Sequence, residues 1–139
     1  MMDANFLSSL FSLQGKRVVV TGASSGLGHH FAALLARAGA QVAVAARRVD
    51  KLQALVTELR ATGAQAEAFA MDVSDAASVR QALAEVVQWC GVPDVVINNA
   101  GVTVGKAALE QTPEDWDQVL DTNLKGAWLL GQAWARHRV

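Results

Sequence analysis

The stretch TGASSGLG, residues 21–28, follows a run of valines at 18–20 and precedes an amphipathic helical pattern, and the predicted fold is organised around it. Its three glycines supply positive φ angles and leave no Cβ where a ligand approaches the backbone. The free N–H groups of the first helical turn, together with the helix dipole, favour a bound pyrophosphate. The pattern therefore predicts a phosphate-binding turn between a buried strand and a helix; a plain tight turn is the alternative interpretation.

The composition limits the classes of function. A chain of 139 residues suits one domain, and a domain of this size buries roughly 68–70% of the surface that its unfolded chain exposes. Charged residues make up 18% and the formal net charge is −1, so the sequence predicts neither disorder nor a nucleic-acid partner. The single cysteine, Cys90, excludes an internal disulfide and fits a reducing compartment. Cys90 itself is interpreted as a small buried hydrophobe.

The first 14 residues contain apolar side chains that serines interrupt, and Asp3 precedes them. A signal peptide needs a basic n-region and a continuous apolar h-region, and neither is present. No window approaches the roughly 20 apolar residues of a transmembrane helix. We therefore expect a soluble, cytoplasmic protein without a membrane partner, in which residues 1–14 form an N-terminal extension and residues 15–139 the folded domain.

Apolar periodicity predicts strands that alternate with helices. The expected strands are residues 16–21, 41–46, 64–70 and 94–98. Continuous apolar runs are typical of strands buried on both faces of a parallel sheet, whereas the alternation over 64–70 indicates an edge strand. In that strand Gln65 and Glu67 are assigned to one side and Phe69 to the other. The β-α-β-α-β-α-β order predicts right-handed crossovers, with helices on both faces of the sheet.

The helices are predicted from apolar residues at helical spacing. The first is expected to bury Leu27, Phe31, Leu34, Leu35 and Ala38. The second is expected to use Asp50 as its cap and to bury Leu52, Leu55, Val56 and Leu59. The third is expected to open at Ser74 and to bury Val79, Leu83, Val86, Val87 and Cys90.

A last helix is predicted after a loop at residues 102–111. Thr112 and Pro113, followed by two acids, are typical of a capped helix start. Asn123 lies on the apolar face of this helix, where an amide without hydrogen-bond partners costs roughly 1–3 kcal/mol. The amide of Asn123 therefore needs partners in the fold. The apolar face comprises Trp116, Val119, Leu120, Leu124, Ala127 and Trp128.

Four motifs occur in order along the chain: Thr21-Gly22-x-x-x-Gly26-x-Gly28, Asp72-Val73, Asn98-Asn99-Ala100-Gly101 and Asn123-x-x-Gly126. With these motifs the chain resembles a classical short-chain dehydrogenase/reductase (SDR). The resemblance implies an α/β fold, a Rossmann-type doubly wound parallel sheet with strand order 3-2-1-4. It implies that residues 15–139 form a dinucleotide-binding domain, truncated after the fourth strand and the following helix.

The resemblance also implies a nicotinamide dinucleotide over the carboxyl ends of the strands. Asp72 is expected to accept a hydrogen bond from the adenine amino group, and the backbone of Val73 to meet the ring. Asn98 is expected to brace the sheet, and a strand-terminating turn is the alternative for the Asn-Asn-Ala-Gly run. The residues expected to bind the cofactor are Gly22, Ser24, Ser25, Gly26, Leu27, Gly28, Arg47, Asp72, Val73, Asn99, Ala100 and Gly101.

Charge at the end of the second strand bears on the choice of cofactor. An acid there would bind the ribose hydroxyls of NAD and repel a 2′-phosphate, but the position is Ala46, and Arg47 follows it. Arg47 can make a charge-assisted contact to the 2′-phosphate of NADP. NADP is therefore the preferred cofactor and NAD the alternative. A solvated pair of arginines, Arg47 and Arg48, at a helix start is the other interpretation of this position.

The catalytic set that the resemblance implies is incomplete. It comprises a tyrosine, a lysine four residues later, a serine and an asparagine, yet the chain contains no tyrosine. Only the asparagine matches, as Asn123. His29 and His30 are interpreted as helix-surface residues, and no cluster has the spacing of metal ligands. The tryptophans are expected to pack or to make subunit contacts: Trp89, Trp116, Trp128 and Trp134.

These observations predict the NAD(P)(H)-binding part of an oxidoreductase that transfers hydride between a nicotinamide cofactor and a small carbonyl or alcohol substrate. The chain stops at Val139, and residues 95–97 would then form an open apolar edge. We therefore expect an N-terminal fragment or truncated product that is inactive alone. A homo-oligomer is expected only in the complete protein. Two alternatives stay open. One is a catalytically silent dinucleotide-binding or interaction module, and the other is a relic that does not fold.

Overall fold

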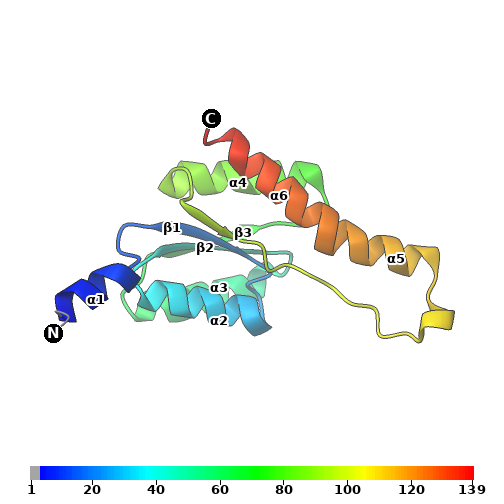
Figure 1. The fold of residues 1–139 in the computed structure, drawn as a ribbon, viewed down its shortest axis with the longest axis horizontal. Coiled ribbons are helices and arrows are strands. Elements are labelled where there is room, and N and C mark those ends of the chain that lie inside the picture. The colour runs from blue at the N-terminus through cyan, green and yellow to red at the C-terminus, as the bar shows by residue number, and fades with distance from the viewer. Residues whose placement is uncertain (1–3) are drawn as a thin grey trace.

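The computed structural model describes residues 4–139 and contains a parallel sheet with helices on both faces (Figure 1). Its strands are β1 (Arg17–Thr21), β2 (Gln41–Ala46), β3 (Ala66–Ala70) and β4 (Val95–Ile97). They lie in the order β3-β2-β1-β4, and every neighbouring pair is parallel. The predicted Rossmann-type sheet and its strand order are confirmed. Residues 1–3, which include Asp3 of the predicted N-terminal extension, lie outside the described residues.

The helices divide between the two faces of the sheet. The α-helices within residues 4–139 are α1 (Ala4–Phe11), α2 (Gly26–Arg37), α3 (Val49–Ala61), α4 (Ala76–Cys90), α5 (Pro113–Leu120) and α6 (Gly126–Arg136). A 3-10 helix, η1 (Ala108–Glu110), interrupts the loop before α5, and a π-helical turn, η2 (Asp121–Lys125), joins α5 to α6. Helices α2 and α3 cover one face, and α4 and α6 cover the other (Figure 1).

Two apolar layers hold these helices to the sheet. Val18 and Val20 of β1 pack toward α2 and α3, whereas Val19 packs toward α4 and α6. All three side chains are buried, which explains why the valine run lacks polar alternation. Full burial of one such side chain stabilises the fold by roughly 1.5–3 kcal/mol, so the valines of β1 hold the sheet to both layers of helices.

Helix α2 contacts the sheet through small residues rather than through the predicted leucines. Its buried residues are Gly28, Ala32 and Ala36, whereas Leu27 and Leu34 are 67% and 52% exposed. The predicted buried stripe is therefore wrong for both leucines, although other members of it border the core. Small side chains let the helix backbone approach the strands closely, and a row of leucines would hold it away.

Two predicted helix starts are also wrong. The cap position of α3 is Arg48, and Asp50 lies inside the first turn. Helix α4 is capped by Asp75, whose carboxylate accepts a hydrogen bond from the backbone N–H of Ala77 at 2.8 Å, rather than by Ser74. The helix bodies follow the predictions, because the apolar stripe of α3 and most of that of α4 are buried.

Phe69 lies on the opposite side of β3 from the predicted one. It packs in the layer of α4, where its ring centroid is 5.9 Å from that of Trp89. Strand residues two apart share a face, so Phe69 lies on the same face as Gln65 and Glu67. The prediction placed Phe69 on the wrong face of this strand. The edge position predicted for β3 is confirmed.

Helices α5 and α6 bury a different face from the predicted one. Gly126, Leu130 and Ala133 are the buried residues of α6, whereas Trp116, Leu124 and Trp128 are 62%, 67% and 59% exposed. The apolar residues do recur at helical spacing, but in the described part of the chain they form a stripe that is exposed on the surface of these helices. The start of α5 agrees with the prediction: Pro113 stands at its first turn, and Thr112 and Asp115 form a capping box.

Two tryptophans and the cysteine pack between elements of the fold. Trp134 donates from Nε1 to the carbonyl oxygen of Pro93 at 2.9 Å, and Trp89 packs on Phe69, so these two tryptophans pack as predicted. Cys90 is half-buried, and burial raises the pKa of its thiol. Within residues 4–139, none of the helices has the length and apolar character needed to cross a membrane.

An ion pair at the amino edge of the sheet leads to a pH-dependent prediction. The carboxylate of Asp94 accepts hydrogen bonds from Nε, Nη2 and the backbone N–H of Arg17, at 3.1, 3.2 and 2.9 Å. These bonds lower the pKa of Asp94 from 3.8 to about 2. Its ionised form therefore stabilises the fold above about pH 4, and this contribution is lost as the pH falls through about 2.

We expect Asp94→Asn to lower the urea midpoint of unfolding, followed by circular dichroism, at pH 7. The difference from the unaltered chain should shrink between about pH 4 and pH 2. A difference that stays constant over this interval would show that the charge of Asp94 does not contribute.

Candidate functional site

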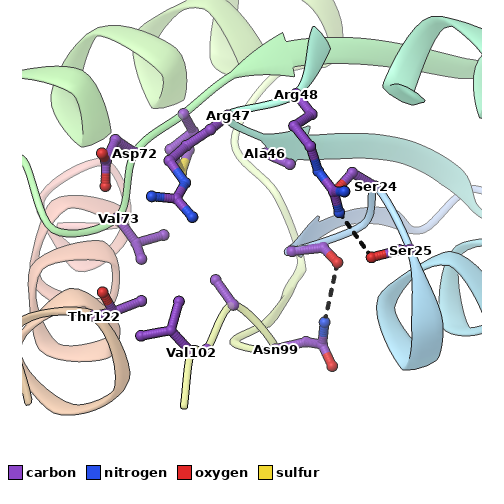
Figure 2. Close-up of a pocket in the computed structure, with 14 residues that line it drawn as sticks. Ser24, Ser25, Ala46, Arg47, Arg48, Asp72, Val73, Asn99, Val102 and Thr122 are labelled. Atoms are coloured by element: carbon purple, nitrogen blue, oxygen red, sulfur yellow. Dashed lines mark hydrogen bonds between the residues drawn. The ribbon is translucent and has the colours of Figure 1, made fainter. Parts of the chain in front are cut away.

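A cleft of about 270 Å³ opens at the carboxyl edge of the sheet (Figure 2). It lies among the glycine-rich turn after β1, the ends of β2 and β3, the turn after β4 and the π-helical turn η2. Ligands of open α/β sheets bind at this edge. Most residues predicted to bind the cofactor line it: Gly22, Ser24, Ser25, Arg47, Asp72, Val73, Asn99, Ala100 and Gly101.

The remaining predicted residues, Gly26, Leu27 and Gly28, form the first turn of α2 and do not line the cleft. The structure adds residues that the sequence interpretation did not assign to the site: Ala46, Arg48, Met71, Val102 and Thr122. Thr122 comes from η2, far along the chain from the glycine-rich turn, so only the fold could reveal it.

Thr21 ties the glycine-rich turn to the end of β4. Its side chain is 1% exposed, and its Oγ1 accepts hydrogen bonds from the N–H groups of Asn99 and Ala100, both at 3.2 Å, while donating to the carbonyl oxygen of Ile97 at 3.3 Å. In return, the amide of Asn99 donates to the carbonyl oxygens of Thr21 and Gly22 at 3.0 and 3.4 Å. Each of these buried polar groups thus has a partner. The glycine-rich turn and the turn after β4, which are distant in sequence, are therefore hydrogen-bonded into one unit beneath the cleft.

The two other asparagines of the motifs fasten the last helix. Asn98 donates to the carbonyl oxygen of Ala127 in α6 at 3.1 Å, so it braces the end of β4 against this helix, whereas Asn99 links β4 to β1. Asn123 accepts from the N–H of Val102 at 2.8 Å and donates to its carbonyl at 2.9 Å. The amide of Asn123 therefore has the expected partners, although it lies on an exposed face. Asn123 does not line the cleft but holds Val102, which does.

Close backbone approach explains two of the glycines. Gly22 has a φ of 65°, and a Cβ there would lie 2.8 Å from Cα of Ala100. A Cβ on Gly28 would lie 2.4 Å from the carbonyl oxygen of Gly22. Only glycine permits this packing. The turn therefore leaves a backbone surface without side chains at the N-terminus of α2.

Arg47 and Arg48 place two positive charges on one wall of the cleft (Figure 2). Arg48 donates from Nη2 to the hydroxyl oxygens of Ser24 and Ser25, both at 2.9 Å. Arg47 extends into the cleft from the end of β2 (Figure 2). The sequence indicated an arginine pair, but the contact between Arg48 and two serines of the preceding turn depends on β1 lying beside β2.

Asp72 supplies a negative charge next to Arg47, after the neighbouring strand β3 (Figure 2). Its Oδ1 accepts hydrogen bonds from the hydroxyl and the backbone N–H of Ser74, at 2.6 and 3.0 Å. The Ser74 hydroxyl and backbone N–H, with the nearby charge of Arg47, lower the pKa of Asp72 despite partial burial. Asp72 is therefore a carboxylate at neutral pH that can accept a hydrogen bond from a ligand.

Within residues 4–139, no three His, Cys, Asp or Glu side chains are grouped so that they could hold a metal ion. His29 lies 3.5 Å from Glu58 of α3, and neither His29 nor His30 lines the cleft. Both histidines therefore occupy the helix-surface positions that the sequence predicts.

Residues 16–138 match the family model described as "short chain dehydrogenase". The chain belongs to the short-chain dehydrogenase family. It is 38% identical over 130 residues to gluconate 5-dehydrogenase from Gluconobacter oxydans. The aligned residues make up 94% of this chain and 51% of that relative. The chain spans about half the length of the curated relatives it matches.

Solved structures of short-chain dehydrogenases share the fold. A short-chain type dehydrogenase/reductase from Mycobacterium marinum is 40% identical with a TM-score of 0.89, over 93% of this chain and 52% of that one. A metagenomic short-chain oxidoreductase, solved in complex with NADP, is 38% identical with a TM-score of 0.83, over 89% of this chain and 57% of that one. The carboxyl-edge cleft thus belongs to a fold shared with an NADP-binding protein.

The packing of the glycine-rich turn gives a prediction for stability. We expect Gly28→Ala to lower the free energy of unfolding by about 1–3 kcal/mol, the usual cost of overpacking, because its Cβ would meet the Gly22 carbonyl oxygen. Gly131→Ala is the matched control, since a Cβ there meets open space within α6. It should stabilise the fold by up to about 1 kcal/mol through helix propensity. Equal effects of the two changes in urea unfolding would contradict the close approach.

Proposed function

We propose that this chain is the cofactor-binding half of an oxidoreductase, which holds NADP, or NAD as the alternative, in the carboxyl-edge cleft. In the whole enzyme, hydride would pass between the nicotinamide and a small carbonyl or alcohol substrate. The observation that carries the proposal is the convergence of the Cβ-free turn, the two arginines and Asp72 on one cleft, in a chain of the short-chain dehydrogenase family.

The residues present fit a dinucleotide. The backbone at Gly22 and Gly28, where a Cβ has no room, suits the approach of a pyrophosphate to the start of α2. Gly26 and Leu27 would offer first-turn N–H groups, and the hydroxyls of Ser24 and Ser25 would donate beside them. After β3, Asp72 would accept from the adenine amino group and Val73 would contact the ring, while Asn99, Ala100 and Gly101 would lie beneath the cofactor.

The preference for NADP rests on charge. Ala46 leaves the end of β2 without the acid that would repel a 2′-phosphate, and Arg47 follows it at the cleft. A 2′-phosphate would also compete for the Arg48 donors that now go to Ser24 and Ser25. Charge-assisted hydrogen bonds are worth roughly 1.5–3 kcal/mol each, so either arginine could set a large preference. The relative solved with NADP supports this choice.

The bound cofactor would supply the hydride chemistry, and the protein would supply its binding and orientation. Of the catalytic set that the resemblance implies, this chain carries only Asn123, which holds Val102 at the rim of the cleft. We therefore propose that the chain alone binds the cofactor without turnover. A catalytically silent binding or interaction module is the second candidate, and the half-exposed edge of β4 favours it.

The remaining parts of the proposal concern the setting of the enzyme. A homo-oligomer in the complete protein is consistent with the exposed stripe of Trp116, Leu124 and Trp128. A cytoplasmic location, with neither membrane nor nucleic acid as partner, is supported by the single thiol, at Cys90, and by the near-neutral net charge of −1.

Isothermal titration calorimetry with NADPH and NADH tests the proposal. We expect NADPH to bind more tightly than NADH, and Arg48→Ala and Arg47→Ala each to weaken NADPH binding about tenfold or more, which is about 1.4 kcal/mol, with little effect on NADH. Arg80→Ala, in α4 and outside the cleft, is the control for loss of one positive charge and should leave both affinities unchanged. A folded chain that binds neither dinucleotide would contradict the proposal.

A further inference from the structure

A second cavity, which we call the amino-edge groove, has a volume of about 590 Å³ and lies at the edge of the sheet opposite the carboxyl-edge cleft. It is bordered by the ends of α2 and α3, the starts of β2 and β3, and the turn before β1, with residues 14–15, 36–37, 39–41 and 62–65 as its lining. The lining residues of the two cavities do not overlap. Ligand sites usually measure roughly 300–1,000 Å³, so the groove is large enough for a ligand, and the proposed cofactor does not account for it.

Two helices end at the amino-edge groove in the same way. Gly39 follows α2 and Gly63 follows α3, with φ angles of 96° and 86°. The N–H of each glycine, and that of the residue after it, donates back to a carbonyl oxygen near the helix end, at distances between 2.9 and 3.3 Å. This is the Schellman motif, which fixes the end of a helix. The carboxyl ends of two helix dipoles therefore meet at the groove, where their partial negative charge favours a ligand that donates hydrogen bonds.

Three glutamines line the same groove, namely Gln14, Gln41 and Gln65. Two of them have fixed backbones: the N–H of Gln41 donates to the carbonyl oxygen of Lys16, and the carbonyl oxygen of Gln65 accepts from the N–H of Val42, both at 2.9 Å. No hydrogen bond between the described residues occupies the carboxamides of Gln41 and Gln65. Because a carboxamide has two N–H donors and an acceptor oxygen, this pair suits a ligand whose groups both donate and accept.

Charge limits the class of ligand. Among the described residues that line the groove, Arg37 alone is ionisable, and it is exposed in the last turn of α2. Arg60 of α3 is engaged elsewhere, since its Nη2 donates to Glu67 at 2.9 Å. Arg37 repels a cation, and the two helix ends disfavour an anion. The small, buried side chains of Ala36 and Ala40 leave room for a ring beside the polar groups. The groove therefore suits a compact, neutral ligand that is rich in hydroxyl groups.

We propose that the amino-edge groove binds a neutral polyhydroxylated ring, of the class of cyclitols and sugars. Hydroxyl groups of the ring donate to the carbonyl ends of α2 and α3 and exchange hydrogen bonds with the carboxamides of Gln41 and Gln65, while Arg37 donates to the ring at the rim. Among the described lining residues none is aromatic, which disfavours a nucleobase held by stacking. The proposal rests neither on family membership nor on the proposed cofactor binding.

Nitrogen–proton correlation spectra of the labelled chain, titrated with myo-inositol, test this site. We expect saturable shifts at residues 14–15, 39–41 and 62–65, and at the side-chain amides of Gln41 and Gln65. The matched control ligand is trans-1,2-cyclohexanediol, which keeps the six-membered ring but has only two hydroxyl groups. Because it loses most of the hydrogen bonds to the groove, it should bind about tenfold more weakly or less tightly still.

Two substitutions separate the groove from the rest of the surface. Gln65→Ala should weaken myo-inositol binding about fivefold or more. Gln53→Ala is its matched control, because it removes an exposed carboxamide of α3 outside the groove, and it should leave the affinity unchanged. Shifts that do not saturate, equal binding of the diol, equal effects of the two substitutions, or shifts mainly at residues 99–102 of the carboxyl-edge cleft would each overturn the proposal. These titrations contain no dinucleotide, so a failure of NADPH binding would not affect them.

Discussion

The buried hydroxyl of Thr21 is the contact on which the site depends. It joins the last residue of β1 to the turn after β4, and the amide of Asn99 completes the connection from the other side. These hydrogen bonds bring Ala100 so close to Gly22 that no Cβ fits between them. The glycine-rich turn and the Asn-Asn-Ala-Gly turn are therefore a single unit, and the cleft above them exists because β1 and β4 are adjacent and parallel.

Charge is arranged around this backbone unit rather than within it. Arg48 reaches back to the serines of the glycine-rich turn, and Asp72 is held as an anion by Ser74. The cleft thus offers cationic donors after β2 and an anionic acceptor after the neighbouring strand β3, together with the backbone surface of the glycine-rich turn. Such a surface suits a ligand with a phosphate at one point and an amino group at another, and this asymmetry is the physical basis for the proposed orientation of a dinucleotide.

Local patterns in the sequence were sufficient for much of the fold. The valine run at β1, the stripe of α3 and the capped start of α5 at Thr112 follow from local sequence patterns. The strand order was implied by the resemblance to the short-chain dehydrogenases. The predicted burial of Leu34 and Trp128 failed because periodicity shows that a helix has an apolar face but not which element covers it. The sequence could equally not predict that Arg48 contacts Ser24, since that pair depends on the register of β1 with β2.

We propose that the unit built on Thr21 and Asn99 makes the carboxyl edge of the sheet a preformed dinucleotide cleft. Nitrogen–proton correlation spectra of the labelled chain during titration with NADP⁺ test it most directly. We expect saturable shifts confined to residues 22–28, 47–48, 72–73 and 99–102, which no single sequence segment contains, with the amides of the amino edge near Gln41 unchanged. A folded chain whose spectrum does not change, or changes mainly at the amino edge, would show that the carboxyl-edge cleft does not bind a dinucleotide.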